Sequence, residues 1–332
     1  MIKVGLIGCG GIAGAHLRAL AAFEERARLV AALDANPEQS RRVGEEYRGI
    51  TVAQNSESFW DVAMDAVIIT VPNRYHRAYV EAAAARGLAI FCEKPLAANL
   101  ADAAAMTAAV ERAGVVNLVG FKNRYFGGIQ ALHRLLGREG LGALFAYREV
   151  CSGARLVNPS IGMEWRMREE IAGGGAVADF GSHSLDMATW LFTPQAGPLV
   201  NLDGRLATFI RREGCLPSND DMALLSGRFA SGALFSALDS RVGPGLYQVE
   251  VYGALGRARV DLSDPDRLHV SAYAKGNEIA VDDDASTSLG NPFTVQMDRF
   301  LRAVAEHRLL QPDFATALSV QRWIEIARAN AR

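Results

Sequence analysis

A glycine-rich loop near the start of the chain constrains the fold more than any other feature. It occupies residues 8–13, reads GCGGIA, follows an apolar run and precedes a helical pattern. A glycine string alone is a weak signal, but a strand before it and a helix after it are the context that a dinucleotide-binding loop requires. Glycine permits the tight turn and lets the backbone approach a pyrophosphate, whose charge meets the free amides of the helix N-terminus. We therefore expect a Rossmann-type site that contacts its dinucleotide through Gly8, Gly10, Gly11 and Ile12.

An acidic residue after the second apolar run bears on the choice of dinucleotide. Asp34 lies roughly twenty residues beyond the glycines, where a carboxylate accepts hydrogen bonds from the adenosine ribose. Its charge would repel the 2′-phosphate of NADP. Arg41 and Arg42 follow closely enough to keep NADP open as an alternative. We predict NAD as the cofactor.

The chain shows two different residue patterns. Up to about residue 120, short β-branched runs alternate with Ala-rich helical segments, which is typical of parallel strands joined by helical crossovers. From 201 to about 281, apolar and polar residues alternate between turn signals, which indicates half-buried antiparallel strands. The expected strands of the first part are residues 4–7, 29–33, 66–71, 89–92 and 115–119, with helices at 16–25, 37–47, 75–86 and 100–113.

Chain length favours two domains, since 332 residues exceed the size at which one hydrophobic core usually stops growing. We predict a doubly wound, parallel Rossmann sheet in residues 1–121. Residues 122–332 should form an α+β domain for substrate binding and oligomerisation, with an open, mainly antiparallel sheet that carries helices on one face. The two C-terminal helices, expected at 294–306 and 314–331, could also pack back on the first domain.

Composition excludes several kinds of partner. The formal net charge of -2 leaves no basic field for nucleic acid or an anionic membrane. Cys9, Cys92, Cys151 and Cys215 show no CxxC spacing, so neither a disulfide framework nor a zinc site is expected. The apolar stretch before Cys9 is too short for a signal sequence, and no window approaches a membrane span. We expect a soluble, unprocessed cytoplasmic protein that acts on a small molecule.

Two further segments carry residues suited to chemistry. Residues 91–95, FCEKP, follow a strand of the predicted cofactor domain, and ligands of α/β folds bind at strand ends. Residues 173–183, GGGAVADFGSH, bring Asp179 and His183 together ahead of a helix that contains Asp186. The histidines without comparable surroundings, expected to be ordinary helix or strand residues, are His16, His133, His269 and His307.

No metal is predicted. The acidic runs at 220–221 and 282–284 lack the alternating spacing and terminal Glu of a calcium loop. We expect both runs to form solvated turns or caps.

Taken together, these segments resemble the Gfo/Idh/MocA family, which includes glucose–fructose oxidoreductase and inositol 2-dehydrogenase. In the first domain the resemblance rests on TVPN at 70–73 with His76 and on EKP at 93–95. It continues through Trp165-Arg166, the segment 179–183, Asp221 and VYGALG at 251–256, and so covers essentially the whole chain.

The resemblance implies roles for three residues. Lys94 would hydrogen-bond the reacting hydroxyl or carbonyl oxygen, His183 would take or return the proton, and Asp179 would help to place the substrate. These chemistries suit the residue types, because an imidazole can act as a general base near neutral pH and a lysine ammonium stabilises a developing alkoxide.

The resemblance also extends the site. Thr70, Asn73, His76 and Glu93 would lie along the nicotinamide-ribose half of the cofactor, beside Lys94. Trp165 and Arg166 would border the substrate pocket, and Asn123 and Arg124 would grip hydroxyls. Which of Lys122, Asn123, Arg124 and Tyr125 faces the pocket stays open at this point.

The function expected is reversible hydride transfer between a nicotinamide cofactor and a secondary alcohol of a sugar, inositol or related polyol. One alternative is an NAD-dependent glycoside hydrolase that oxidises its substrate transiently, and another is a non-catalytic cofactor-sensing regulator. An open sheet has one face for helices and another, including Phe229, Leu234 or Phe235 depending on register, that must be covered, so we also expect a homodimer or homotetramer. The motifs do not identify the substrate, because loops such as residues 152–170 determine which sugar or polyol binds.

Overall fold

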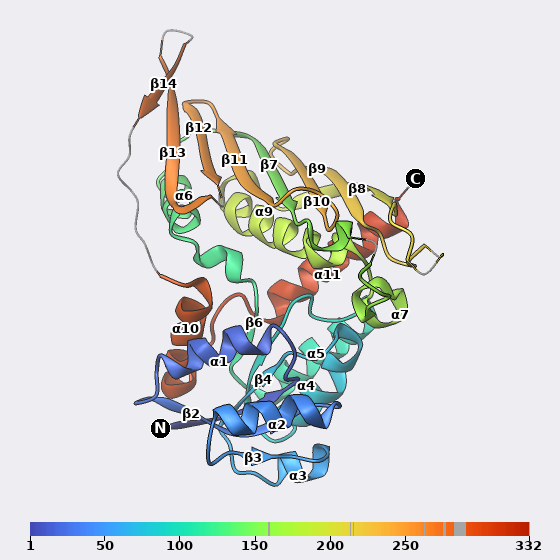
Figure 1. Cartoon of the computed structure of the whole chain (residues 1–332). Helices are drawn as coiled ribbons and strands as arrows, with labels where there is room; N and C mark the ends of the chain where they lie inside the picture. Colours follow the sequence, from blue (N-terminus) through green and yellow to red (C-terminus); the bar gives the residue numbers. More distant parts are fainter. Residues whose placement is uncertain are drawn as a thin grey trace. The chain divides into compact units, whose positions relative to one another are not determined.

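The computed structural model describes residues 1–331 apart from 159, 213, 215, 262, 275–276 and 282–289 (Figure 1). Cys215 and the acidic run at 282–284 therefore lie outside the described residues. The chain forms two compact units. The first unit comprises residues 1–122 and 291–321, and the second comprises residues 123–290 and 322–332.

The first unit is built on a six-stranded parallel sheet with the strand order β3-β2-β1-β4-β5-β6. The order reverses between β1 and β4, and ligands of doubly wound sheets bind in the crevice at the carboxyl ends of such strands. The strands are β1 (Ile2–Ile7), β2 (Ala27–Leu33), β3 (Thr51–Val52), β4 (Ala66–Ile69), β5 (Ala89–Cys92) and β6 (Asn117–Val119).

Helices follow these strands along the chain, as the alternation of β-branched runs and Ala-rich segments predicted. The helices are α1 (Ala13–Ala21), α2 (Pro37–Glu46), α3 (Ser56–Trp60), α4 (His76–Ala84) and α5 (Leu100–Ala113), and α10 (Pro292–Glu306) also belongs to this unit. Apolar side chains of α1 and α10 share one core cluster with β1 and β5. The four residues of β4 and the four of β5 are all buried, as a sheet covered on both faces requires.

The second unit carries an eight-stranded sheet with the order β14-β13-β12-β11-β7-β10-β9-β8. Neighbouring strands are antiparallel except β7 and β10, which pair in parallel. The strands are β7 (Leu144–Ser152), β8 (Leu199–Ala207), β9 (Met222–Phe229), β10 (Leu234–Ser240), β11 (Leu246–Gly253), β12 (Gly256–Asp261), β13 (Asp264–Ala274) and β14 (Asn277–Val281). The predicted fold class, a parallel Rossmann sheet with a second, mainly antiparallel sheet, is confirmed.

One face of the second sheet is covered by helices. The helices of this unit are α6 (Gly127–Gly137), α7 (Glu169–Ala172), α8 (Ala176–Asp179) and α9 (Gly181–Ala196), and α11 (Phe314–Ala329) runs from the first unit into the second. Figure 1 shows α6 and α9 on the same side of the sheet. Between α9 and the sheet, Tyr147 stacks on Phe235 at 5.9 Å between ring centroids, and Phe192 lies 5.1 Å from Phe229.

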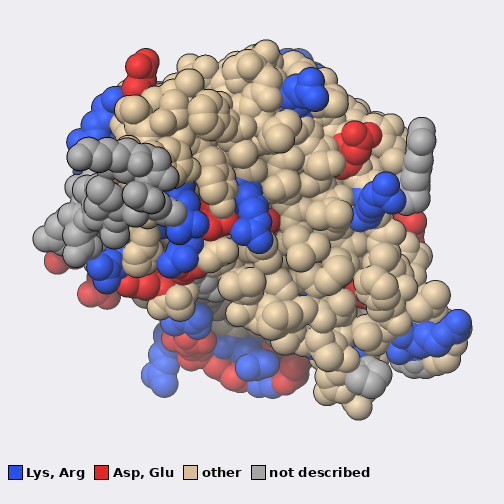
Figure 2. Space-filling model, turned by 90° about the horizontal axis from the view of Figure 1, so that it is seen from above, with Lys and Arg blue, Asp and Glu red and all other residues tan. Residues whose placement is uncertain are grey.

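The opposite face leaves apolar side chains exposed. Leu238 of β10 lies beside Val150 of β7 and Leu224 of β9, which forms an apolar row across three strands. Leu224 is 49% exposed and Leu234 is 54% exposed. Figure 2 views the molecule from above Figure 1 and shows a broad area with few Lys, Arg, Asp or Glu side chains.

Candidate active site

The glycine loop, residues 8–13, connects β1 to α1 in the first unit. Gly8 has a φ of 89°, and a Cβ there would lie 2.7 Å from the backbone nitrogen of Val71, so only glycine fits. A Cβ on Gly10 or Gly11 would instead meet nothing within 4 Å. Ile12, which precedes α1, supplies no side-chain cap for the helix. Open space above these glycines, next to an uncapped helix start, is the arrangement that a pyrophosphate fits.

The side chain of Asp34 hydrogen-bonds the backbone of the glycine loop from the end of β2. Its Oδ2 accepts the backbone N–H of Cys9 at 2.6 Å, and its Oδ1 accepts the N–H of Asn36 at 2.8 Å. The carboxylate is therefore held at the end of β2, where it can accept hydrogen bonds from a ribose. Arg41, which kept NADP open, is engaged by two carboxylates on α2, those of Glu38 and Glu45. This geometry favours NAD.

Thr70 and His76, two of the residues expected to contact the cofactor, hydrogen-bond the backbone of loops at the ends of the strands. The Oγ1 of Thr70 donates to the carbonyl oxygen of Gly8 at 2.6 Å and so fastens the glycine loop to the end of β4. His76 is fully buried, with Nδ1 3.0 Å from the carbonyl oxygen of Leu96 and Nε2 2.8 Å from that of Val71. Burial lowers the pKa of His76 despite both contacts. The ring joins the loops that contain Val71 and Leu96, and its place along the nicotinamide ribose stays a prediction.

Glu93 and Lys94 follow β5 at the same edge of the sheet. The backbone N–H of Glu93 donates to Ile69 at 2.9 Å, which continues the pairing with β4. The carboxylate of Glu93 is buried and contacts His16 at 2.7 Å, whereas Lys94 is partly exposed. Asn73 is also buried, in the turn that follows β4. His16 was expected to be an ordinary helix residue, and nothing in the spacing of residues 16 and 93 indicates that they are in contact.

The second unit positions Asp179 and His183 around a break between two helices. Asp179 ends α8, and His183 lies in the first turn of α9, four residues further along the chain. Gly175 precedes α8, and a Cβ there would lie 1.8 Å from the carbonyl oxygen of Asp220. The carboxylate of Asp220 accepts the N–H groups of Gly175 at 2.8 Å and of Val177 at 2.9 Å. Gly175, the last of the three glycines, is therefore required by a close backbone approach that fixes the start of α8.

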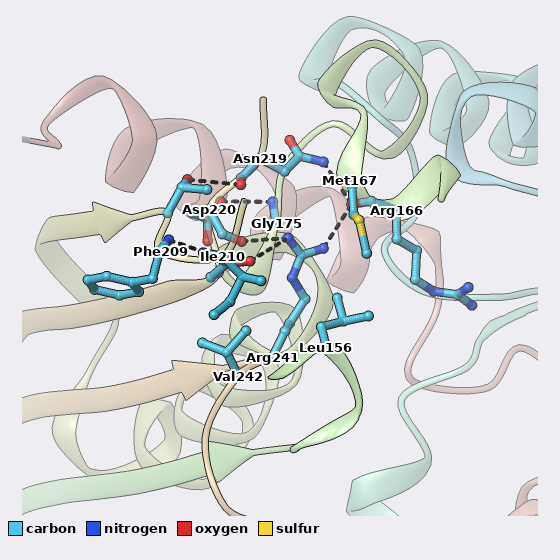
Figure 3. A network of polar contacts seen from close by, with 12 residues as sticks. Leu156, Arg166, Met167, Gly175, Phe209, Ile210, Asn219, Asp220, Arg241 and Val242 are labelled. Atoms are coloured by element: carbon cyan, nitrogen blue, oxygen red, sulfur yellow. Dashed lines mark hydrogen bonds and ion pairs between the residues drawn. The ribbon is translucent and has the colours of Figure 1, made fainter. Parts of the chain in front are cut away.

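A buried arginine, Arg241, extends this anchor to Arg166 (Figure 3). Arg241 donates to the carbonyl oxygen of Asp220 at 2.7 Å and to that of Arg166 at 2.8 Å. Burial lowers the pKa of Arg241, while the negative charge of Asp179 acts in the opposite direction. The guanidinium of Arg166 points away from the network and lies over the ring of Trp165, 4.3 Å from its centroid.

The acidic pair at 220–221 was expected to form solvated turns or caps. Both carboxylates bind backbone amides, Asp220 at α8 and Asp221 at Phe209 and Ile210, so they do cap backbone groups. Asp220 is 8% exposed and Asp221 is 1% exposed, so the solvated alternative is wrong. Arg241, 3.9 Å from Asp221, compensates the buried charge.

The polar segment at 122–125 turns partly inward. Arg124 is buried, and its Nε donates to Oδ2 of Asp186 at 2.8 Å while Nη2 donates to Oδ1 at 2.5 Å. Its guanidinium also lies 4.9 Å from the ring centroid of Trp190. Arg124 therefore forms a buried ion pair, and the expectation that it grips substrate hydroxyls stays a prediction. Asn123 is buried and hydrogen-bonds Tyr247.

Two buried carboxyl groups lie beneath α9 and were not predicted. Glu149 of β7 is 1% exposed and accepts the hydroxyl of Tyr147, and Asp239 of β10 is fully buried and accepts the hydroxyl of Ser184 at 2.7 Å. Burial raises the pKa of Glu149 to about 7 and that of Asp239 well above its usual range. Ser184 follows His183 directly, so this acid pair underlies the helix turn that carries the candidate base.

Comparison with known proteins places the chain in a family. Residues 2–121 match the family model described as an oxidoreductase family with an NAD-binding Rossmann fold, and residues 129–259 match the Gfo/Idh/MocA C-terminal domain. The chain belongs to the Gfo/Idh/MocA oxidoreductase family. It accordingly carries an NAD-binding Rossmann domain, as the glycine loop and Asp34 predicted.

Two characterised relatives illustrate the similarity in sequence. The levoglucosan dehydrogenase of Pseudarthrobacter phenanthrenivorans is 26% identical over 96% of this chain and 93% of the relative. The D-apiose dehydrogenase of Paraburkholderia graminis is 34% identical over 81% of this chain and 69% of the relative.

Solved structures show the same fold. Levoglucosan dehydrogenase in complex with NADH superposes with a TM-score of 0.89 at 25% identity, covering 99% of this chain and 98% of that one. The aldose-aldose oxidoreductase of Caulobacter crescentus, complexed with glycerol, gives a TM-score of 0.84 at 25% identity over 100% and 97% of the two chains.

The described part of the chain contains neither a candidate metal cluster nor a helix that could span a membrane. Among these residues, no group of three His, Cys, Asp or Glu side chains could hold a metal ion. Within the same residues, no helix has the length and apolar character needed to cross a membrane.

Proposed function

We propose that this protein catalyses the reversible, NAD-dependent oxidation of a secondary alcohol on a sugar, inositol or related polyol. The observation that carries the proposal is that the chain has Lys94 in an NAD-binding unit and Asp179 and His183 on a rigidly anchored helix pair. Relatives named levoglucosan dehydrogenase, D-apiose dehydrogenase and inositol 2-dehydrogenase support the substrate class. Residues 1–121 would bind the cofactor and residues 122–332 the substrate.

Each of the three residues has a chemical task in this proposal. Oxidation breaks the C–H bond of the alcohol carbon with its electron pair, while the hydroxyl proton leaves to His183 as general base. Lys94 donates a hydrogen bond to the same oxygen and stabilises the negative charge that develops on it. Asp179 accepts a hydrogen bond from a neighbouring substrate hydroxyl. Bound NAD would supply the acceptor for the electron pair, and in the reverse direction His183 returns the proton.

The proposal keeps the cofactor and substrate contacts expected from the sequence. Gly8, Gly10, Gly11 and Ile12 would line the pyrophosphate, and Asp34 would accept hydrogen bonds from the adenosine ribose. The residues proposed for the nicotinamide-ribose half are Thr70, Asn73, His76, Glu93 and Lys94. Those proposed to border the substrate are Asn123, Arg124, Trp165 and Arg166.

A substrate panel with matched variants tests the proposal. Aldoses, inositols, deoxy sugars and keto sugars, with levoglucosan among them, would be assayed by NADH and separately NADPH absorbance. Lys94→Ala and His183→Ala are each expected to lower kcat by roughly a hundredfold or more, because each removes a group that acts on the reacting oxygen. Lys3→Ala and His133→Ala are the controls and should retain activity.

Binding separates loss of chemistry from loss of fold. Lys94→Ala should leave the dissociation constant of NADH, measured by fluorescence, within about threefold, which is under 1 kcal/mol of binding free energy. Full turnover by Lys94→Ala would sink the assignment of this residue.

A second candidate is a reaction without net oxidation. Relatives named 2,7-anhydro-N-acetylneuraminate hydratase, from Escherichia coli and Mediterraneibacter gnavus, are 26% and 25% identical to this chain. A transient oxidation that is reversed before product release, as in the NAD-dependent hydrolase alternative, would consume no cofactor. Product formation from an anhydro sugar or aryl glycoside without accumulation of NADH would favour this candidate. NAD-dependent binding to another protein without any turnover would instead favour a regulator.

We also propose a homodimer or homotetramer that covers the exposed sheet face. The apolar row of Val150, Leu238 and Leu224 supports this proposal, because exposed apolar patches on a sheet are usually interaction surfaces. A monomer mass by light scattering at micromolar concentration would contradict it, and Leu224→Lys should lower the oligomer fraction. A cytoplasmic location is proposed as well, in keeping with the buried thiols of Cys9 and Cys92.

A further inference from the structure

The carboxylate of Glu93 links Lys94 to a histidine on a distant part of the chain. His16, on α1, is fully buried, and its Nε2 lies 2.7 Å from Oε1 of Glu93. The other carboxylate oxygen, Oε2, accepts the backbone N–H of Lys94 at 3.1 Å. One carboxylate therefore connects the imidazole to the backbone of the lysine that is proposed to contact the substrate.

Neighbouring groups fix the geometry of this pair. The imidazole of His16 meets the ring of Phe91 edge to face at 4.9 Å between centroids and that of Phe293 at 5.4 Å. A Cβ on Gly120 would lie 2.9 Å from Oε1 of Glu93, so glycine leaves the space that the carboxylate occupies. Aromatic walls keep water away from the contact, and an electrostatic interaction that is shielded from water is stronger than an exposed one.

The charge of Glu93 depends on this contact. Burial alone would raise the pKa of Glu93, but the hydrogen bond from His16, the charge of His16 and the charge of Lys94 outweigh it, so the net pKa is lowered. Glu93 is therefore an anion at neutral pH. Without His16, the carboxylate would stay buried with its main partner gone, and protonation or rotation would relieve the penalty.

We propose that His16 is a positioning residue for Lys94 and acts through Glu93. The inference rests on the proposed function, since it adds a residue to the machinery in which Lys94 contacts the reacting oxygen. His16 holds the carboxylate in one orientation, and the carboxylate holds the backbone of Lys94 and sets the negative charge beside its ammonium group. Packing alone would need only a side chain of similar shape at residue 16, whereas this role needs an N–H at the position of Nε2.

Lysine labelling tests the proposal without a substrate. The chain has only four lysines, Lys3, Lys94, Lys122 and Lys275, so labelling can be measured at each one. Brief acetylation of the full chain with acetic anhydride, followed by peptide mass spectrometry, gives the rate at Lys94 relative to Lys3. His16→Leu is expected to raise this ratio about threefold or more, because Lys94 is then no longer held by the charged carboxylate of Glu93 and becomes more accessible to the reagent.

Two further variants separate positioning from packing. His16→Gln, whose amide N–H can replace Nε2, should keep the ratio within about twofold of the unsubstituted chain. Glu93→Gln should raise the ratio as His16→Leu does, and the double variant should raise it no further, since both changes remove the same charge. An unchanged ratio in His16→Leu and Glu93→Gln would overturn the proposal. If circular dichroism shows that His16→Leu is unfolded, the ratio in Glu93→Gln decides alone.

Kinetics then connect the contact to turnover. With levoglucosan, or with whichever polyol of the panel reacts faster, His16→Leu is expected to lower kcat on the order of tenfold and to leave KM within about threefold. His16→Gln should restore most of kcat. Lys94→Ala is measured alongside. Full turnover by Lys94→Ala would refute the role of Lys94 in the proposed function, whereas a roughly hundredfold loss there with full kcat in His16→Leu would refute only the positioning role of His16.

Discussion

Replacing Glu149 by Gln should change how the stability of the protein depends on pH. The carboxyl group is 1% exposed, and burial raises its pKa to about 7 from an ordinary value of 4.5. A raised folded-state pKa means that the unfolded chain releases this proton first as the pH increases. The contribution to stability is therefore full below about pH 4.5 and is lost as the pH rises through about 7. A shift of about 2.5 units corresponds to roughly 3 kcal/mol.

Burial, and to a smaller extent the negative charge of Asp186, explain why Glu149 retains its proton. Hydrogen bonds from Tyr147 and Ser184 act in the opposite direction and lower its pKa, but burial outweighs them. The pKa values of Asp239 and Tyr247 are raised, first by burial and then by the charge of Glu149. Gln reproduces the shape of the protonated acid and cannot ionise, so it should be tolerated in this cluster.

Urea unfolding followed by circular dichroism at about pH 4 and about pH 8.5 measures the effect. The free energy of unfolding of Glu149→Gln should match that of the unsubstituted chain at the lower pH and exceed it by roughly 3 kcal/mol at the higher pH. Glu111→Gln, a change at an exposed position of α5, is the control and should show no such divergence. Parallel pH profiles for Glu149→Gln and the unsubstituted chain would refute the reasoning.

Further expectations concern two glycines. Gly10→Ala should leave the free energy of unfolding within about 0.5 kcal/mol, because its Cβ meets nothing within 4 Å, yet it should weaken NADH binding roughly tenfold or more by filling the cofactor's space. Gly137→Ala in α6, where a Cβ also meets nothing within 4 Å, is the control and should change the free energy of unfolding and NADH binding less. If Gly10→Ala binds NADH as tightly as the unsubstituted chain does, the glycine loop is not part of the cofactor site. Gly175→Ala should cost roughly 3 kcal/mol or more in urea unfolding, because its Cβ would lie 1.8 Å from a backbone oxygen; a cost below about 1 kcal/mol would show that the α8 start can yield.

Features that depend on neighbouring residues could be predicted from the sequence. The strands expected at 29–33, 66–71 and 89–92 correspond to β2, β4 and β5, because runs buried on both faces are recognisable without their partners. The glycine loop and Asp34 were predicted for the same reason, since the motif is contained in one βαβ unit. The short elements β3 and α3 were missed, as two and five residues carry too little periodic signal.

Features that depend on pairing across the chain could not be predicted. His16 and Glu93 are 77 residues apart, and Arg124 and Asp186 are 62 residues apart, so neither ion pair leaves a local pattern. The acid pair of Glu149 and Asp239 requires the parallel pairing of β7 with β10, strands that are not consecutive. Register also decided which apolar residues face the core.

Because side chains alternate between the two faces of a strand, the register of pairing determines which apolar residues of β9 and β10 face the core. The expected uncovered face included Phe229, Leu234 or Phe235, depending on register. Phe229 and Phe235 are buried in the aromatic core, and Leu234 is exposed. Alternation along the strands indicated that two faces exist, while the pairing of β9 with β10 determines which residues share one.

Deuterium transfer tests the central claim most directly. Levoglucosan, or another polyol of the panel, would be deuterated at its secondary alcohol carbons and incubated with NAD and the full chain, and the cofactor would be analysed by mass spectrometry. Direct transfer to NAD predicts deuterated NADH in proportion to the oxidised product, formed roughly a hundredfold or more slowly with Lys94→Ala. Binding of NADH without deuterium in the cofactor for any polyol would contradict the proposed dehydrogenase.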